Sequence, residues 1–152
     1  MGLPSRTAAS ALPCPGREKD VNDRLQRAVE TAGAAIRTEQ HPGDIGELIR
    51  MHGMLYASEH GYSMGFEAYV AKTFSGYDWP LGPRERLWIL EKAGEVRGSI
   101  AIVKASETEA QLRWLLLHPV LRGHGLGKAL VEEAVAFSRA GGYASVILWT
   151  EA

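Results

Sequence analysis

A run of three glycines between two basic side chains is the part of this sequence with the clearest chemistry. Arg122, Gly123, Gly125, Gly127 and Lys128 stand close together, directly before a stretch with helical periodicity. Glycines at alternate positions let the backbone adopt positive φ and approach a ligand closely, so that successive N–H groups can point into one concavity. The N-terminus of a helix adds about half a positive charge. We therefore predict an anion site, with a phosphate or pyrophosphate as its natural ligand.

Two better-known glycine motifs do not fit this turn. A P-loop needs a glycine five positions before Gly127 and a Ser or Thr after Lys128, but these positions hold Arg122 and Ala129. The dinucleotide-binding fingerprint fails as well, because Lys128 stands where its third glycine should be. The pattern thus excludes a Walker A site and a Rossmann site.

The turn is placed between a strand and a helix by the residues around it. Residues 112–117 are apolar at nearly every position, which predicts a strand buried on both faces. Residues 126–140 have the periodicity of an amphipathic helix, which Gly141 and Gly142 end. A further strand is predicted over residues 145–150.

Periodicity and turn residues predict the rest of the chain. Ala93 and Gly94 have the turn chemistry of an antiparallel hairpin. The expected elements are a strand over 34–39, helices over 45–59 and 65–74, a loop over 76–83, and the hairpin strands 87–91 and 95–104.

Composition excludes several classes of function. The chain has 152 residues, of which 45% are hydrophobic, and this is typical of one globular domain. A net charge of −1 argues against a nucleic-acid partner held by bulk charge. No apolar run approaches the roughly 18 residues that span a membrane, and the single cysteine, Cys14, fits a reducing compartment. We expect a cytoplasmic protein, and no metal site because the histidines lack ligand spacing.

The N-terminal residues differ in composition from the rest. Prolines and small residues dominate residues 1–19, so we expect them to be mobile. A polar helix is predicted over residues 20–31. We therefore divide the chain into a mobile N-terminal segment with a short helix, residues 1–33, and a folded domain, residues 34–152.

The turn, with its context, resembles the GNAT superfamily of N-acetyltransferases, which binds acetyl-CoA. The sequence from Arg122 to Gly127 matches the family's R-G-x-G-x-G pattern, and Leu115 to Pro119 looks like its fourth strand and the exit from it. The resemblance covers about residues 35–150. It implies an α+β fold with a mixed, mostly antiparallel and splayed sheet flanked by helices. A second set of residues resembles the acetyltransferase half of bacterial proteins fused to a MarR-type DNA-binding domain: Ile36, Arg37, His41, Pro42, Gly43, Asp44, His52, Gly53, Leu55, Tyr56, Ala57 and Glu59.

The resemblance implies where acetyl-CoA, as co-substrate, would bind. Leu115 and Leu117 would pair through their backbone with the pantetheine arm, with Leu116 between them, and an N–H near Leu117 would polarise the thioester carbonyl. The pyrophosphate would be held by backbone N–H groups of the turn, which are those of Arg122, Gly123, His124, Gly125, Leu126, Gly127 and Lys128.

Acetyl transfer also needs a neutral amine. An alkylamine of pKa about 10.4 is mostly charged at neutral pH, so deprotonation costs on the order of 4 to 5 kcal/mol, which a general base or an ordered water must offset. The resemblance places Glu59 near the acceptor cleft, with Tyr56 one turn before it, and we take these two as catalytic candidates. Glu59 could equally be a solvated carboxylate at a helix end. The other candidate side chains are His60, Glu107, Glu109 and His118, of which His118 also reads as a turn histidine.

The sequence departs from the family at its C-terminal end. Relatives continue after the fifth strand with a helix and two more strands, so we expect the strand ending at Thr150 to expose its edge, and the chain to form a homodimer or to need a completing partner chain. Two functions therefore stay open. One is an N-acetyltransferase acting on a small-molecule or peptide amine, and the other is a truncated, catalytically silent domain that binds coenzyme A or a protein.

Overall fold

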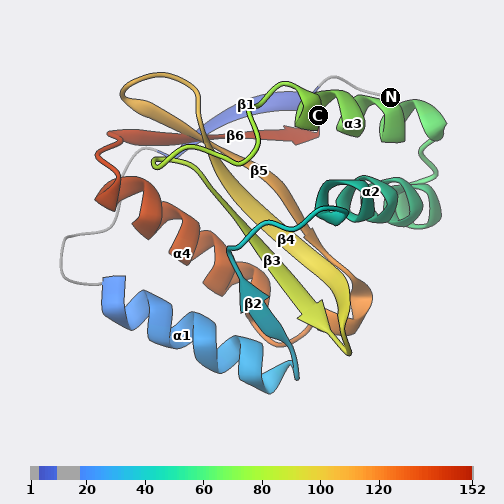
Figure 1. Cartoon of the computed structure of the whole chain (residues 1–152), viewed down its shortest axis with the longest axis horizontal. Helices are drawn as coiled ribbons and strands as arrows, with labels where there is room; N and C mark the ends of the chain where they lie inside the picture. The colour runs from blue at the N-terminus through green and yellow to red at the C-terminus, as the bar shows by residue number, and fades with distance from the viewer. Residues whose placement is uncertain (1–3, 10–17, 152) are drawn as a thin grey trace.

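The computed structural model describes residues 4–9 and 18–151, and in them one mixed sheet is flanked by helices (Figure 1). The strand order is β1-β6-β5-β4-β3-β2, and among these described strands only β5 and β6 run parallel. This confirms the predicted α+β class with a mostly antiparallel sheet. The elements are β1 Pro4–Ala9, α1 Glu18–Thr31, β2 Ala35–Arg37, α2 Asp44–His60, α3 Met64–Ser75, β3 Arg86–Lys92, β4 Glu95–Lys104, β5 Glu109–Leu117, the short 3-10 helix η1 Pro119–Leu121, α4 Leu126–Ala140 and β6 Ser145–Glu151.

Helices cover both faces of the sheet. Figure 1 shows α1 and α4 together on one face and α2 with α3 on the other. Alternate residues of β4 enter the two cores: Ile100 and Ile102 pack with α1 and α4, whereas Ala101 and Val103 pack with α2 and α3. The continuous apolar strands of the sequence are therefore explained by burial on two sides.

The alternation of β5 side chains between the two faces of the sheet is interrupted at Trp114. Before this residue, Leu112 packs on the α1 and α4 side, but Trp114 and Leu116 both pack on the α2 and α3 side. The register against β4 shifts at the same point, and Trp114 has a φ of 52°. The Ser99 hydroxyl donates a hydrogen bond of 2.6 Å to the Trp114 carbonyl. A β-bulge therefore divides β5 into two parts with opposite alternation.

Beyond the bulge, β5 separates from β6. The parallel pairing runs from Glu109 opposite Ser145 to Leu112 opposite Leu148, and the described residues show no pair after it. The other edge of β6 pairs with β1 from Val146 to Glu151. Among the described residues, the part of β5 from 114 to 117 therefore has an open edge on the β6 side, which is the predicted splay.

The outer edge of β6 is covered, which corrects one expectation. Residues 4–9, which we expected to be mobile, form β1 and pair antiparallel with β6 from Pro4 opposite Glu151 to Ala9 opposite Val146. The predicted exposed edge at Thr150 is therefore wrong, because β1 supplies its backbone partners. The self-association inferred from that edge loses this support, while Cys14 lies outside the described residues.

Helix α1 packs into the same core as α4. Val21, Leu25 and Val29 are buried, and Leu25 and Val29 share a core with Leu130 and Ala134 of α4. The helix expected over residues 20–31 is thus confirmed and begins two residues earlier. The domain boundary after residue 33 stays a prediction.

Candidate functional site

The turn before α4 is anchored at both ends and open between them. Leu121 and Leu126 are fully buried, whereas every residue from 122 to 125 is exposed. Gly123 and Gly125 have φ values of 86° and 71°, in the region that favours glycine. A Cβ atom at either position would meet nothing within 4 Å. These glycines are therefore required by backbone conformation rather than by close packing within the protein.

The N-terminus of α4 has unused hydrogen-bond donors. The Ala129 N–H donates to the Gly125 carbonyl at 3.2 Å, and Gly125 offers no side-chain cap. Within residues 4–9 and 18–151, the N–H groups of residues 125 to 128 have no acceptor. No acidic residue lies in the first turn of α4. An anion can therefore satisfy these donors and interact favourably with the helix dipole.

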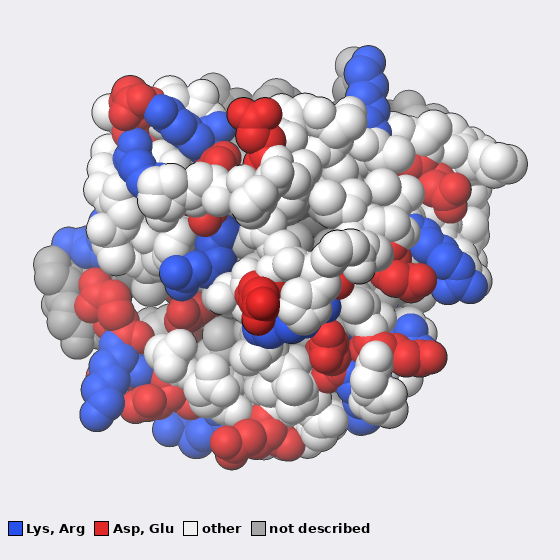
Figure 2. All heavy atoms as spheres, in the orientation of Figure 1, with Lys and Arg blue, Asp and Glu red and all other residues white. Residues whose placement is uncertain are grey.

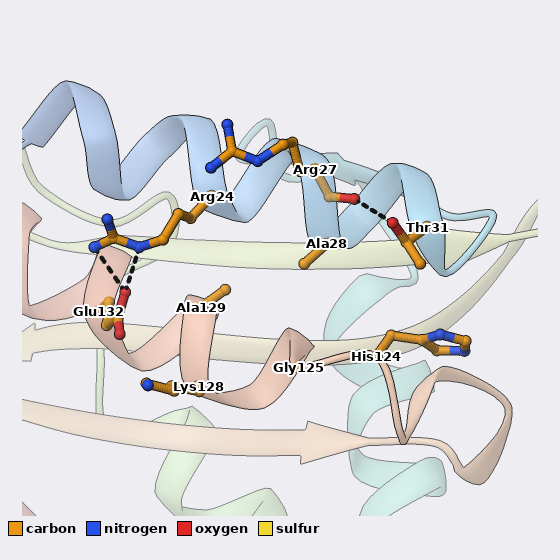
Figure 3. Close-up of a pocket in the computed structure, with 9 residues that line it drawn as sticks. All are labelled: Arg24, Arg27, Ala28, Thr31, His124, Gly125, Lys128, Ala129 and Glu132. Atoms are coloured by element: carbon orange, nitrogen blue, oxygen red, sulfur yellow. Dashed lines mark hydrogen bonds and ion pairs between the residues drawn. The ribbon is translucent and has the colours of Figure 1, made fainter.

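A hollow of about 410 Å³ lies beside this helix end, between α1 and α4 (Figure 3). Arg24 reaches across from α1 to Glu132, with Nε and Nη2 at 3.1 and 3.0 Å from Oε2, so this carboxylate is neutralised. Arg27 extends along α1, and its backbone carbonyl accepts a hydrogen bond of 2.9 Å from the Thr31 hydroxyl. The residues that line the hollow are Arg24, Arg27, Ala28, Thr31, His124, Gly125, Lys128, Ala129 and Glu132.

The basic side chains that line the hollow, Arg24, Arg27 and Lys128, do not belong to a larger basic surface within the part of the chain that the structure describes. Lys and Arg side chains are interspersed with Asp and Glu over the face in Figure 2, in keeping with the net charge of −1. Arg24 and Arg27 are not among the predicted site residues, because the helix over residues 20–31 is recognised in the sequence by its apolar face alone. Their three-residue spacing on the flank of that face was the available signal.

The end of β5 lies against the turn. A Cβ atom on Gly127 would be 3.6 Å from Cδ1 of Leu117, so the strand end and the first turn of α4 are neighbours. Leu115 is exposed and Leu116 is buried on the α2 and α3 side. The carbonyl of Leu117 accepts a hydrogen bond of 3.0 Å from Nε of Arg122. The structure thus brings the predicted strand residues and the glycine turn together.

Glu59 is bound by an arginine of the turn. Its Oε2 and Oε1 lie 2.5 and 2.8 Å from Nη1 and Nη2 of Arg122. Hydrogen bonding to Arg122 holds the pKa of the Glu59 carboxyl below its ordinary value. A carboxylate with a lowered pKa is a weaker base. The residue pairing spans 63 positions of sequence, and nothing in the sequence pattern predicts it.

Tyr56 lies in an aromatic cluster between α2 and α3. Its ring centroid is 4.4 Å from that of Phe66, 5.5 Å from that of Tyr62 and 5.2 Å from that of His60. Tyr56 is half-buried and packs against the α2 and α3 core. The ring therefore has a packing role, and its catalytic role stays a prediction.

His118 caps the short helix after β5. Its Nδ1 accepts a hydrogen bond of 3.2 Å from the Val120 N–H. Burial lowers the pKa of the imidazole, and the charges of Arg97 and Arg122 lower it further. A neutral ring that accepts at Nδ1 carries its proton on Nε2. In this arrangement His118 is a capping residue and has no free lone pair to accept a proton.

The other candidate carboxylates lie away from the turn. Glu109 begins β5, whereas the turn follows the opposite end of that strand. Glu107 precedes it and pairs with Lys104 and Arg84. The described part of the chain contains no cluster of three His, Cys, Asp or Glu side chains that could hold a metal ion. None of its helices has the length and apolar character needed to cross a membrane.

Comparison with known proteins identifies the fold. The model of the acetyltransferase (GNAT) family matches residues 53–152. An acetyltransferase from Streptococcus agalactiae is 22% identical, with a TM-score of 0.56 over 76% of this chain and 72% of that one. A GNAT family acetyltransferase from Brucella melitensis, solved in complex with acetyl-CoA, is 21% identical, with a TM-score of 0.58 over 76% and 74%.

A third solved structure has the same relationship. It is a protein from Clostridium acetobutylicum described as a predicted acetyltransferase with acetyl-CoA, and it is 15% identical, with a TM-score of 0.59 over 78% of this chain and 81% of that one. No curated protein sequence matches the chain. Because the family model matches well over half of the residues, the chain belongs to the GNAT family of acetyltransferases.

Proposed function

We propose that this protein is an N-acetyltransferase that transfers an acetyl group from acetyl-CoA to a primary amine. The observation that carries the proposal is the uncapped glycine turn before α4, set directly beside the open edge of β5. The turn offers N–H donors to a diphosphate, and the open edge offers a strand to pair with. The family and the relatives solved with acetyl-CoA support the choice of this co-substrate.

The coenzyme would lie along the path that these two features define. Its pyrophosphate would accept hydrogen bonds from the N–H groups of residues 125 to 128. Its pantetheine amides would pair with the backbone of residues 115 to 117, as an added strand does. This path would place the thioester near the bulge, where a backbone N–H could polarise its carbonyl.

The proton of the amine would leave through water. Glu59 and Tyr56 are the catalytic candidates from the sequence, but both oxygens of Glu59 are occupied by Arg122. Its lowered pKa makes direct proton uptake unfavourable. We propose that an ordered water at the end of β5 relays the proton to solvent. The acceptor amine stays open among antibiotic, polyamine, peptide N-terminus and lysine side chain.

A second candidate function is supported by the same contacts. Glu59 and His118, the two candidate bases at the end of β5, both have their acceptor atoms engaged. A domain that binds coenzyme A without turnover would have no need of a free base. The two functions share the coenzyme site and differ only in catalysis.

One experiment tests both functions. Calorimetric titration with acetyl-CoA, with light scattering in parallel, measures binding and oligomeric state. Ligand at about 100 times its Kd should also stabilise the fold by roughly 2.7 kcal/mol, which a melting curve detects. Release of free coenzyme A thiol is then followed with polyamine, aminoglycoside, peptide and lysine acceptors, against a blank without acceptor because Cys14 also carries a thiol.

The outcomes separate the alternatives. Binding followed by acceptor-dependent thiol release supports the enzyme. Binding without release for any acceptor favours the silent domain. A folded chain that does not bind acetyl-CoA contradicts the enzyme and leaves a silent domain that binds a protein partner.

A further inference from the structure

The glycine turn has few side-chain contacts to hold its shape. Gly123 and Gly125 contribute no side chain, and His124 is exposed with no hydrogen bond in the described structure. Between the buried anchors Leu121 and Leu126, Arg122 makes the side-chain hydrogen bonds that the structure records for this turn. A turn rich in glycine loses much conformational entropy when it is ordered. The contacts of Arg122 therefore decide how well the turn is ordered before a ligand arrives.

Three elements meet at the guanidinium of Arg122. Its Nε donates to the carbonyl of Leu117 at the end of β5 at 3.0 Å. Its Nη1 and Nη2 donate to the two oxygens of Glu59 at 2.5 and 2.8 Å. Glu59 stands at the end of α2, just before its cap residue Gly61, which has a φ of 69°. A planar fork bound at three points fixes the orientation of the arginine more tightly than a single ion pair does.

We propose that Glu59 is a positioning residue, which acts through Arg122 to hold the turn in the shape that binds the diphosphate of the coenzyme. This inference rests on the proposed function and gives Glu59 a role other than that of general base. Because the turn is ordered before the coenzyme arrives, the binding free energy is not reduced by the cost of ordering the turn. The same contact ties the end of α2 to the coenzyme turn.

The alternative roles of Glu59 predict different kinetics. A positioning residue changes the affinity for acetyl-CoA, and its removal has no effect once Arg122 is gone. A general base changes kcat at saturating coenzyme and moves the acidic limb of the pH profile, whether or not Arg122 is present. A carboxylate that only restrains a free arginine would, when removed, let Arg122 bind phosphate and strengthen binding.

The test is a double-mutant cycle of Glu59→Gln and Arg122→Ala, measured by calorimetric titration with acetyl-CoA. Glu59→Gln should raise Kd about twofold to fivefold, as expected for a well-formed exposed ion pair. In the Arg122→Ala background it should have no further effect on Kd. With an acceptor that turns over, KM for acetyl-CoA should rise while kcat and the pH profile stay unchanged. Glu47→Gln is the matched control, since it makes the same change at the opposite end of α2.

Melting curves check that each variant is folded. If Arg122→Ala does not fold, Arg122→Lys replaces it, because lysine keeps the positive charge but cannot form the bidentate hydrogen bonds of a guanidinium group. Glu59→Asp keeps the charge and should recover part of the affinity. Unchanged or tighter binding by Glu59→Gln overturns the inference, as does a loss that persists in the Arg122→Ala background or appears in kcat. If the native chain does not bind acetyl-CoA, both the proposed function and this inference are contradicted. If the native chain and Glu59→Gln bind acetyl-CoA equally well, only this inference is contradicted.

Discussion

Gly125 and Gly43 form a natural pair for testing the coenzyme site. Each is the N-cap of a helix, Gly125 of α4 and Gly43 of α2, and neither cap has a side-chain hydrogen bond. Their φ values are 71° and 97°, and a Cβ atom would meet nothing within 4 Å at either position. Replacement by alanine should therefore add backbone strain without a clash. We expect each variant to lose about 1 kcal/mol of stability, which lowers Tm by roughly 2–4 °C.

Only Gly125→Ala should lose the coenzyme. Its new methyl group would stand in the open space before the N–H donors of α4, where the pyrophosphate is proposed to lie. A hydrogen bond to a charged group contributes about 1.5–3 kcal/mol, so the loss of one such bond weakens binding roughly 10-fold to 100-fold. Gly43→Ala should bind acetyl-CoA like the native chain.

The assay is calorimetric titration of the three proteins with acetyl-CoA, together with melting curves with and without ligand. Binding by Gly125→Ala within twofold of the native value, with the expected drop in Tm, would refute the assignment of the turn as the pyrophosphate site. An equal loss of binding by Gly43→Ala would show that reduced stability, rather than the local methyl group, is responsible.

Three further substitutions test the surroundings of the site. Gly98→Ala should destabilise the fold by about 1–3 kcal/mol in denaturant unfolding, because its Cβ would lie 3.0 Å from the carbonyl oxygen of Leu116. Asp44→Ala should cost roughly 3 kcal/mol in the same assay, because buried Asp44 holds the guanidinium of Arg37 at 2.8 Å through both oxygens. Burial lowers the pKa of His118 below its ordinary value of 6.5, so protonation favours the unfolded state and the native protein should lose stability as the pH falls below 6.5. The variant His118→Asn keeps the cap and does not titrate. Melting curves at pH 7 and pH 5 should therefore show a smaller loss of stability for this variant than for the native protein.

Local patterns predicted much of this fold. The helix over residues 126–140 has the predicted bounds, because its apolar period and the glycines after it are both strong signals. The hairpin around Ala93 and Gly94 was equally clear, and Ala93 indeed has a positive φ of 53°. The glycine turn is where the sequence placed it. These features depend on residues close together in the chain.

The features that escaped prediction depend on distant residues. β1 forms because β6 offers backbone partners, and its proline-rich surroundings gave no sign of a strand. The bulge at Trp114 is hidden because residues 112–117 are almost uniformly apolar, so a change of facing leaves no trace in the pattern. The pairing of Glu59 with Arg122 joins helix and turn through side chains alone. Tertiary structure sets these features, and local sequence patterns do not contain them.

The bulge at Trp114 makes the backbone geometry of β5 more critical than its composition. Leu112 faces one core before it, and Leu117 packs toward that same core after it, although the two are an odd number of residues apart. Loss of the bulge without any change in length would restore strict alternation and move Leu117 to the opposite side of the sheet. Leu117 is the side chain next to Gly127. A β5 strand without the bulge could keep its apolar character in full and still leave the turn before α4 without its neighbour.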